Sequence, residues 1–217
     1  ISWVIILLFL GTSCIYYDSE EPNNDIEFEN NELFRNFLSS KNSNDWSASG
    51  SASNPVVVSS IDSNSNNEFV IAGVMSGSTT LSMGSSSITS GQYVEPWMAK
   101  LDSNGNWQWM VKISVTGTTQ FAEAIIADIS IAPNGDIFAT GRFYETISFG
   151  GISLSSTGYY DSWVAKLSSS GQWVWAEALR GNGDYDGALV TSIDWIQGTS
   201  ITTDSNSNVI AGGFFLG

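Results

Sequence analysis

The sequence contains no histidine and a single cysteine, Cys14. Histidine is the most common general base and a frequent zinc ligand, so its absence excludes Ser-His-Asp and Cys-His catalytic arrangements and most zinc sites. One cysteine excludes an intrachain disulfide. The catalytic chemistry open to this chain is therefore limited to groups that act without a histidine partner.

Charged residues are also scarce, and most of them are acidic. Only 13% of the residues are charged, Lys and Arg together number seven, and the formal net charge is −15. Nucleic-acid binding by phosphate neutralisation requires a basic stripe, and attraction to anionic lipid requires a basic cluster. We therefore expect no nucleic-acid partner, and no membrane contact except through the apolar N-terminus.

Tryptophan, by contrast, recurs at a fixed spacing. Three tryptophans return 66 positions later, as the pairs Trp97 and Trp163, Trp107 and Trp173, Trp109 and Trp175. A second motif recurs at residues 69–73, 137–141 and 209–213. Gly213 follows Gly171 by 42 positions, whereas Gly141 follows Gly105 by 36, so the chain carries six extra residues, which we place at 194–199. An internal repeat of this length indicates an architecture of equivalent units.

Each unit consists of short alternating runs between turns that contain glycine. In the second unit the runs are 127–132, 137–143, 162–167 and 172–178. They predict two linked hairpins, and hence four antiparallel strands. Since Trp173 and Trp175 are two positions apart, we expect both indoles on one face, covered by the next unit.

Units that cover one another in this way are typical of β-propeller blades. The expected fold is all-β: a partial β-propeller of four-stranded antiparallel blades. At about 66 residues per unit, the chain holds about two and a fraction blades. We therefore expect it to be a fragment of a longer protein.

The N-terminus predicts export. Residues 1–17 are uncharged and include an apolar run at 3–10, which is typical of a signal peptide. Cys14 follows Gly11, Thr12 and Ser13, which resembles the lipobox of lipoproteins and implies lipidation of Cys14. A cleaved signal peptide, a retained anchor helix and a buried strand are the alternatives. The first three possibilities place the protein outside the cytoplasm, either secreted or held at the cell surface by a lipid or a membrane anchor.

Residues 18–54 are acidic and rich in Asn and Ser, which is typical of a flexible tether. Apolar residues between 26 and 38 predict one short amphipathic helix that packs on the repeats. The propeller repeats are expected to occupy 55–217.

The order of motifs resembles the β-propeller repeat family of bacterial and archaeal surface proteins, of the seven-bladed type. Residues 161–167 with Gly171, residues 181–188 and residues 129–141 carry this resemblance. It implies an extracytoplasmic repeat protein without an assigned chemistry. Residues 99–109 also resemble the tryptophan-docking repeat of quinoprotein dehydrogenases, which implies an alternative propeller enzyme.

The candidate metal ligands are Asn182, Asp184 and Asp186, which offer oxygen atoms to calcium from a glycine-flanked loop. An exposed acidic loop is the simpler interpretation, and an acid–base pair of the two aspartates is a further one. No catalytic or cofactor-binding residue is predicted.

Three Asp-Ser-Asn stretches, which begin at Asp62, Asp102 and Asp204, resemble the start of a calcium loop. They lack the closing glutamate and are predicted to be turns. Lys100 and Lys166 hold equivalent positions, so we expect a structural role such as pairing with an acid of a neighbouring blade.

Taken together, these features predict a surface-anchored propeller that acts without catalysis and binds a glycan, a protein or another surface component through its loops. Two alternatives remain. One is a propeller-based enzyme, quinoprotein-like or active on glycans, with its active residues in other blades. The other is a structural spacer of the cell surface without a dedicated ligand.

Overall fold

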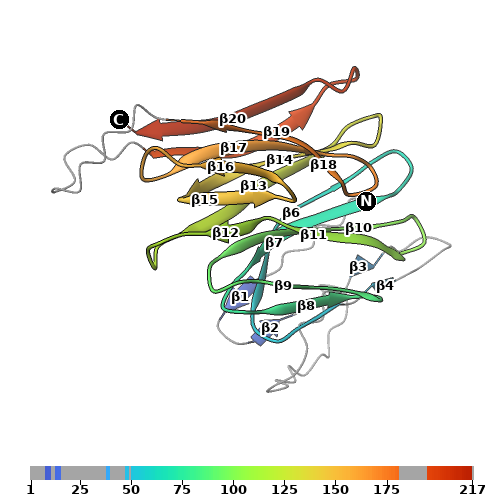
Figure 1. The fold of residues 1–217 in the computed structure, drawn as a ribbon. Helices are drawn as coiled ribbons and strands as arrows, with labels where there is room; N and C mark the ends of the chain where they lie inside the picture. The colour runs from blue at the N-terminus through green and yellow to red at the C-terminus, as the bar shows by residue number, and fades with distance from the viewer. Residues whose placement is uncertain are drawn as a thin grey trace.

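The computed structural model describes residues 8–10, 13–15, 38–39, 47–48, 50–180 and 195–216. All regular secondary structure within these residues is β-strand (Figure 1). The strands form antiparallel sheets of two to four strands. The prediction of an all-β chain is therefore confirmed.

Two sheets have four strands each. The first consists of β6 (Val56–Ser63), β7 (Phe69–Met75), β10 (Glu95–Leu101) and β11 (Trp107–Lys112). The second consists of β13 (Glu123–Ile131), β14 (Ile137–Tyr144), β17 (Asp161–Leu167) and β18 (Trp173–Leu179). In both sheets each strand pairs with the next in this order, as the two linked hairpins predict. The hairpin of β19 (Trp195–Thr203) and β20 (Val209–Leu216) repeats the first half of this arrangement.

Two smaller sheets were not predicted. β8 (Thr80–Met83) and β9 (Ser86–Thr89) pair with β5 (Gly50–Ala52), and β15 (Thr146–Phe149) and β16 (Ile152–Ser155) pair with β12 (Ser114–Thr116). Serine and glycine are frequent in these segments, so they have the composition of loops. They form strands because alternate residues of β8 and β15 are buried beneath the larger sheets.

Two short hairpins lie near the N-terminus. β1 (Leu8–Leu10) pairs with β2 (Ser13–Ile15), which places Cys14 opposite Phe9, and β3 (Leu38–Ser39) pairs with β4 (Ser47–Ala48). Leu38, the last residue of the predicted helix, therefore belongs to a strand, and residues 26–37 lie outside the described residues. In the part of the chain that the structure describes, no helix is long and apolar enough to cross a membrane.

The sheets stack face to face, as the layers in Figure 1 show. β13 packs on β6 and β7, and β19 packs on β13, β14 and β17. The main core lies between the first and second sheets and includes Val70, Ala72, Met98, Ile129, Ile137 and Phe143. A smaller cluster of Ala132, Phe138 and Ile201 joins the second sheet to β19. Each layer thus shields the next from water.

The paired tryptophans of β18 face opposite sides of their sheet, so the prediction of one shared face is wrong. Trp173 lies opposite Leu167 and Trp175 lies opposite Lys166, which leaves Val174 as the extra residue of a β-bulge. Neighbouring residues of β17 point to opposite faces, and their partners across the strand do the same.

Ring contacts agree with this bulge. The centroid of Trp173 lies 4.8 Å from that of Phe149, whereas Trp175 lies 6.0 Å from Phe138 in the cluster on the other face. The same bulge separates Trp107 from Trp109 in the first sheet. Each unit therefore places one of these indoles on each face.

The six extra residues between Gly171 and Gly213 are also located differently from the prediction. Residues 195–199 belong to β19, which pairs with β20 from Trp195 to Thr203. The register shift between Gly198 and Ser200 has counterparts in β6 and β13, so it is a feature of every unit. Because an insertion within the strand would break this pairing, the extra residues lie between β18 and β19.

Candidate binding site at the turn end of the sheets

Three equivalent turns lie at the same end of the stacked sheets. They connect β6 to β7, β13 to β14 and β19 to β20, and each is closed by a backbone hydrogen bond across residues 64–68, 132–136 or 204–208. The fourth residue of each has a left-handed φ: 56° at Asn67, 85° at Gly135 and 63° at Ser207. Glycine and asparagine tolerate this conformation best, so the sequence favours the reversal in the first two turns, whereas Ser207 adopts it in the third.

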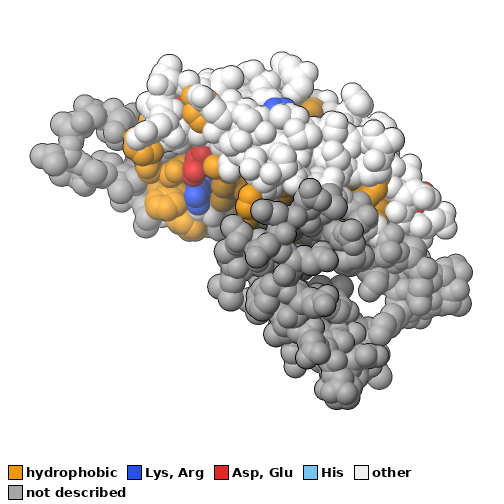
Figure 2. Space-filling view, turned by 90° about the horizontal axis from the view of Figure 1, so that it is seen from below, with side chains coloured by type: hydrophobic (Ala, Val, Ile, Leu, Met, Phe, Trp, Pro, Cys, Tyr) orange, Lys and Arg blue, Asp and Glu red, His pale blue; other side chains and the backbone are white. Residues whose placement is uncertain are grey.

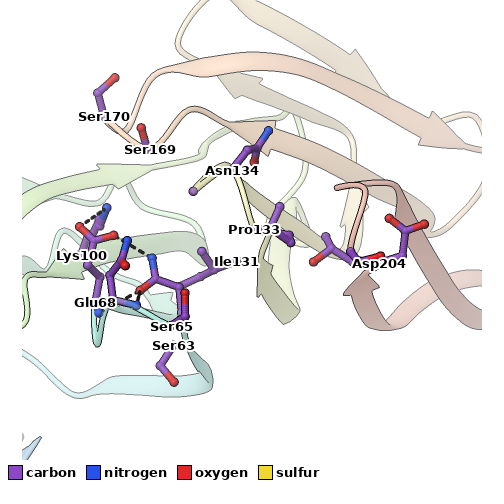
Figure 3. A pocket seen from close by; sticks show the side chains of 16 residues that line it. Ser63, Ser65, Glu68, Lys100, Ile131, Pro133, Asn134, Ser169, Ser170 and Asp204 are labelled. Carbon is purple, nitrogen blue, oxygen red and sulfur yellow. Dashed lines mark hydrogen bonds and ion pairs between the residues drawn. The ribbon is translucent and has the colours of Figure 1, made fainter.

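An open cleft of about 640 Å³ lies between these three turns and the β17–β18 turn. Figure 3 shows Glu68 and Lys100 on one side of it, Asp204 on the other, and Ser169 and Ser170 on a third side. The remaining lining combines small polar side chains with a few apolar residues. The polar ones are Ser63, Asn64, Ser65, Asn66, Asn134, Thr203 and Ser205, and the others are Ile131, Ala132, Pro133 and Gly135. The cleft is therefore rich in hydroxyl, amide and peptide groups.

The lysine of the cleft, Lys100, forms an ion pair with an acid of its own sheet. Lys100 is buried, and its Nζ lies 2.9 Å from Oε1 of Glu68. Hydrogen bonds from Asn64 and then from Lys100 hold the pKa of Glu68 below its usual value. A charge-paired lysine is a poor nucleophile or base, so this pair is structural.

The equivalent pair recurs in the second unit, where Nζ of Lys166 lies 2.7 Å from Oδ2 of Asp136. In both units the acid comes from the turn before the neighbouring strand of the same sheet. The expected structural role is confirmed, but the prediction of an acid from a neighbouring blade is wrong. The turn that precedes the neighbouring strand brings its acid beside the lysine of the adjacent strand.

Asp102 and Asp204 close turns, as predicted. The carboxylate of Asp204 accepts hydrogen bonds from the side chain and backbone of Asn208, and these lower its pKa. Backbone and side-chain bonds from Asn106 act in the same way on the pKa of Asp102. The carboxylates stay ionised as turn acceptors.

Asp62 has a different role from the predicted turn. It lies within β6, and its Oδ2 accepts the backbone N–H of Ile131 in the next unit at 2.7 Å. Asp128 makes the same kind of bond to the following unit, since its Oδ2 accepts the backbone N–H of Ile201 at 2.9 Å. Its Oδ1 also accepts the Ser60 hydroxyl of the preceding unit at 2.8 Å. These carboxylates hold the first strands of successive units side by side behind the cleft.

Trp109 contacts the β17–β18 turn, which lines one side of the cleft. Its Nε1 donates to the carbonyl oxygen of Ser169 at 3.1 Å. A Cβ added to Gly171 would lie 2.8 Å from Cδ2 of Trp109, so the indole lies directly against this glycine. Trp97 and Trp163 are fully buried in the core. Trp109 therefore links two units, and none of the repeated tryptophans lines the cleft.

The opposite end of the sheets carries a cluster that is not repeated. Arg142 lies 4.8 Å from the ring centroid of Tyr160 and 5.5 Å from that of Trp195, and it bonds Gln197 and Glu123. Val74 of the first unit and Phe214 of the third take the equivalent position, so among the described residues this cluster occurs at one place. On one side of the described surface, Figure 2 shows hydrophobic side chains gathered around a basic and an acidic group. Two partners of Arg142, Tyr160 and Glu123, belong to the second unit, and the other two belong to β19 of the third. The cluster therefore links these two units.

The structure does not test the remaining predicted site residues. Asn182, Asp184 and Asp186 lie outside the described residues, and Cys14 lies in β2. Among the residues that the structure describes, no group of three or more His, Cys, Asp or Glu is suited to a metal ion. Sequence reasoning missed the cleft itself. The recurrence of one turn type at 64–68, 132–136 and 204–208 was the available signal.

No protein-family model matches the chain, and no curated protein matches it in sequence. A functional assignment therefore depends on the geometry of the stacked sheets and of the cleft.

Proposed function

We propose that this protein is an extracytoplasmic, surface-anchored β-propeller repeat protein that binds a glycan or a protein without catalysis. Its ligand occupies the cleft at the turn end. Three observations support the propeller: the sheets are equivalent, each has its strands in sequential order, and each covers the face of the next. An apolar N-terminus that ends near Cys14 supports export and lipid anchoring.

The observation that carries the binding proposal is the cleft built from equivalent turns of three successive units. Its volume of about 640 Å³ lies within the range of small-ligand sites, roughly 300–1,000 Å³. Lys100 and Glu68 cancel each other's charge, which leaves Asp204 as the remaining charged residue of the lining, and most of the lining side chains are hydroxyls and amides. Such a surface suits a neutral, hydroxyl-rich ligand, so a glycan fits better than an anion.

The test is a glycan array probed with the full chain and two variants. Ser205→Trp fills the cleft from an exposed position, and Ser85→Trp places the same side chain on the exposed β8–β9 turn as a control. We expect binding to at least one glycan class, lost in the first variant and kept in the control. Binding that survives Ser205→Trp contradicts the cleft as the site. Absence of binding to glycans and to surface proteins favours a structural spacer.

A further inference from the structure

The cleft takes the same three positions from each of the three turns that connect first and second strands. They are residues 63–65 of the first turn, 131–133 of the second and 203–205 of the third. The strand registers make these sets equivalent, because Ser63, Ile131 and Thr203 each lie in the pair nearest the turn of their hairpin. The lining of the cleft therefore repeats with the units of the fold.

The three turns follow one another in the order of the layers. The Ile131 N–H donates to Asp62 in the strand before the first turn. β13 packs on both β6 and β19, and Figure 3 shows Pro133 between Ser65 and Asp204. Because sheets that pack face to face lie about 10 Å apart, the first and third turns are separated by two such spacings. A ligand that reaches both is a chain of linked groups, longer than one sugar.

The middle turn differs chemically from the outer two. Ser65 and Ser205 are exposed and offer hydroxyl groups, which can both donate and accept hydrogen bonds. The equivalent residue of the second turn is Pro133, which is also exposed and whose side chain offers only an apolar ring. The order is thus hydroxyl, apolar, hydroxyl. A chain of pyranose rings matches this order, because each ring has an apolar C–H face between polar edges.

The turns hold these side chains in place before any ligand arrives. Oδ1 of Asp204 accepts the backbone N–H of Asn206 at 2.8 Å, and this bond spans Ser205. Asn64 makes the equivalent bond across the first turn, and the ring of Pro133 fixes φ in the second. Binding groups that are already ordered lose little conformational freedom on binding, which favours affinity.

We propose that the cleft binds a neutral, extended oligosaccharide with β-1,4 linkages that spans all three turns. Its outer rings bond the hydroxyls of Ser65 and Ser205, and the C–H face of a central ring packs on Pro133. Since β-1,4 linkages give an extended ribbon, rings along one chain can lie at successive turns. Asp204 carries a negative charge beside the third turn, so an acidic sugar is repelled there. This inference rests on the proposed function and adds the length, shape and charge of its ligand.

The test is isothermal titration calorimetry of the full chain with two neutral series, β-1,4-linked glucose and β-1,4-linked N-acetylglucosamine, each from one to five units. We expect at least one series to bind, with affinity that rises at least about tenfold from one unit to five, because contacts at linked positions reinforce one another. A carboxylated form of the same oligomer should bind more weakly than the neutral one.

Variants of the lining test whether one ligand contacts all three turns. Ser65→Ala, Pro133→Ala and Ser205→Ala should each weaken binding of the pentamer about threefold to tenfold. The matched controls are Ser85→Ala and Pro55→Ala, which change exposed residues outside the cleft and should leave the affinity unchanged.

The outcomes separate this inference from the proposed function. Equal affinity for one unit and five overturns the spanning ligand, as does a pentamer that responds to only one of the two serine variants. If neither series binds while another glycan binds and is lost in Ser205→Trp, the cleft stands as the site and the β-1,4-linked ligand is wrong. Absence of binding to any glycan contradicts the glycan ligand of the proposed function as well.

Discussion

Replacement of Gly171 by Ala should weaken the contact between the first and second units. Gly171 has a φ of +79°, and a Cβ there would lie 2.8 Å from Cδ2 and 2.9 Å from Cγ of Trp109. Left-handed φ costs an L-residue about 1 kcal/mol after the gain from restricting the unfolded chain. Overpacking against the indole adds about 1–3 kcal/mol. We therefore expect Gly171→Ala to lower the free energy of unfolding by about 2–4 kcal/mol.

Gly77 offers a matched control, because it has a φ of +65° with nothing within 4 Å of an added Cβ. Gly77→Ala should cost only the backbone strain, about 1 kcal/mol. Urea unfolding followed by tryptophan fluorescence measures both variants. For a chain of this size each 1 kcal/mol corresponds to a Tm change of about 2–4 °C.

A double variant locates the added cost. Trp109→Leu removes the indole that the new Cβ meets, so Gly171→Ala in that background should cost no more than Gly77→Ala. The coupling energy between the two positions should be at least about 1 kcal/mol. Equal destabilisation by Gly171→Ala and Gly77→Ala, together with additive effects in the double variant, would refute the docking of Trp109 on the next unit.

Two further predictions concern the polar links between units. Asp128→Ala removes the acceptor for both the Ile201 N–H and the Ser60 hydroxyl. It should therefore lower the free energy of unfolding, measured in urea, by about 2–4 kcal/mol, whereas Ser60→Ala should lower it by about 1 kcal/mol. Equal losses in the two variants would contradict the link. The pKa of Glu68 is lowered in the folded state, so its stabilisation is present above its unfolded pKa of about 4.3 and is lost as pH falls through the folded pKa. Glu68→Gln should therefore flatten the loss of stability between about pH 5 and 3, measured as urea midpoints, and a slope identical to that of the original chain would contradict this role.

Much of the local structure could be predicted from the sequence. The four strands of the second unit and their turns appear close to the expected positions, because alternating apolar residues and glycine-containing turns are local signals. The turns at Asp102 and Asp204 follow from side chains that bond their own backbone. The repeat also indicated that successive units cover one another, since the aromatic faces needed burial.

Other features depended on contacts between distant residues. Whether Trp175 shares a face with Trp173 was decided by the bulge at Val174, which periodicity cannot reveal. The Ser-rich strands β8 and β15 form because larger sheets cover them. The cleft could not be read from any single turn, because its walls come from four turns spread over more than one hundred residues.

The sequence by itself determined the repeat, the strand type and the reversals, because each of these arises from residues a few positions apart. The tertiary structure alone decided that Asp62 bonds the Ile131 N–H instead of closing a turn, and that Lys100 pairs with Glu68 of its own sheet. Both outcomes follow from distances between strands. Stacking and register set those distances, and the identity of a residue does not encode them.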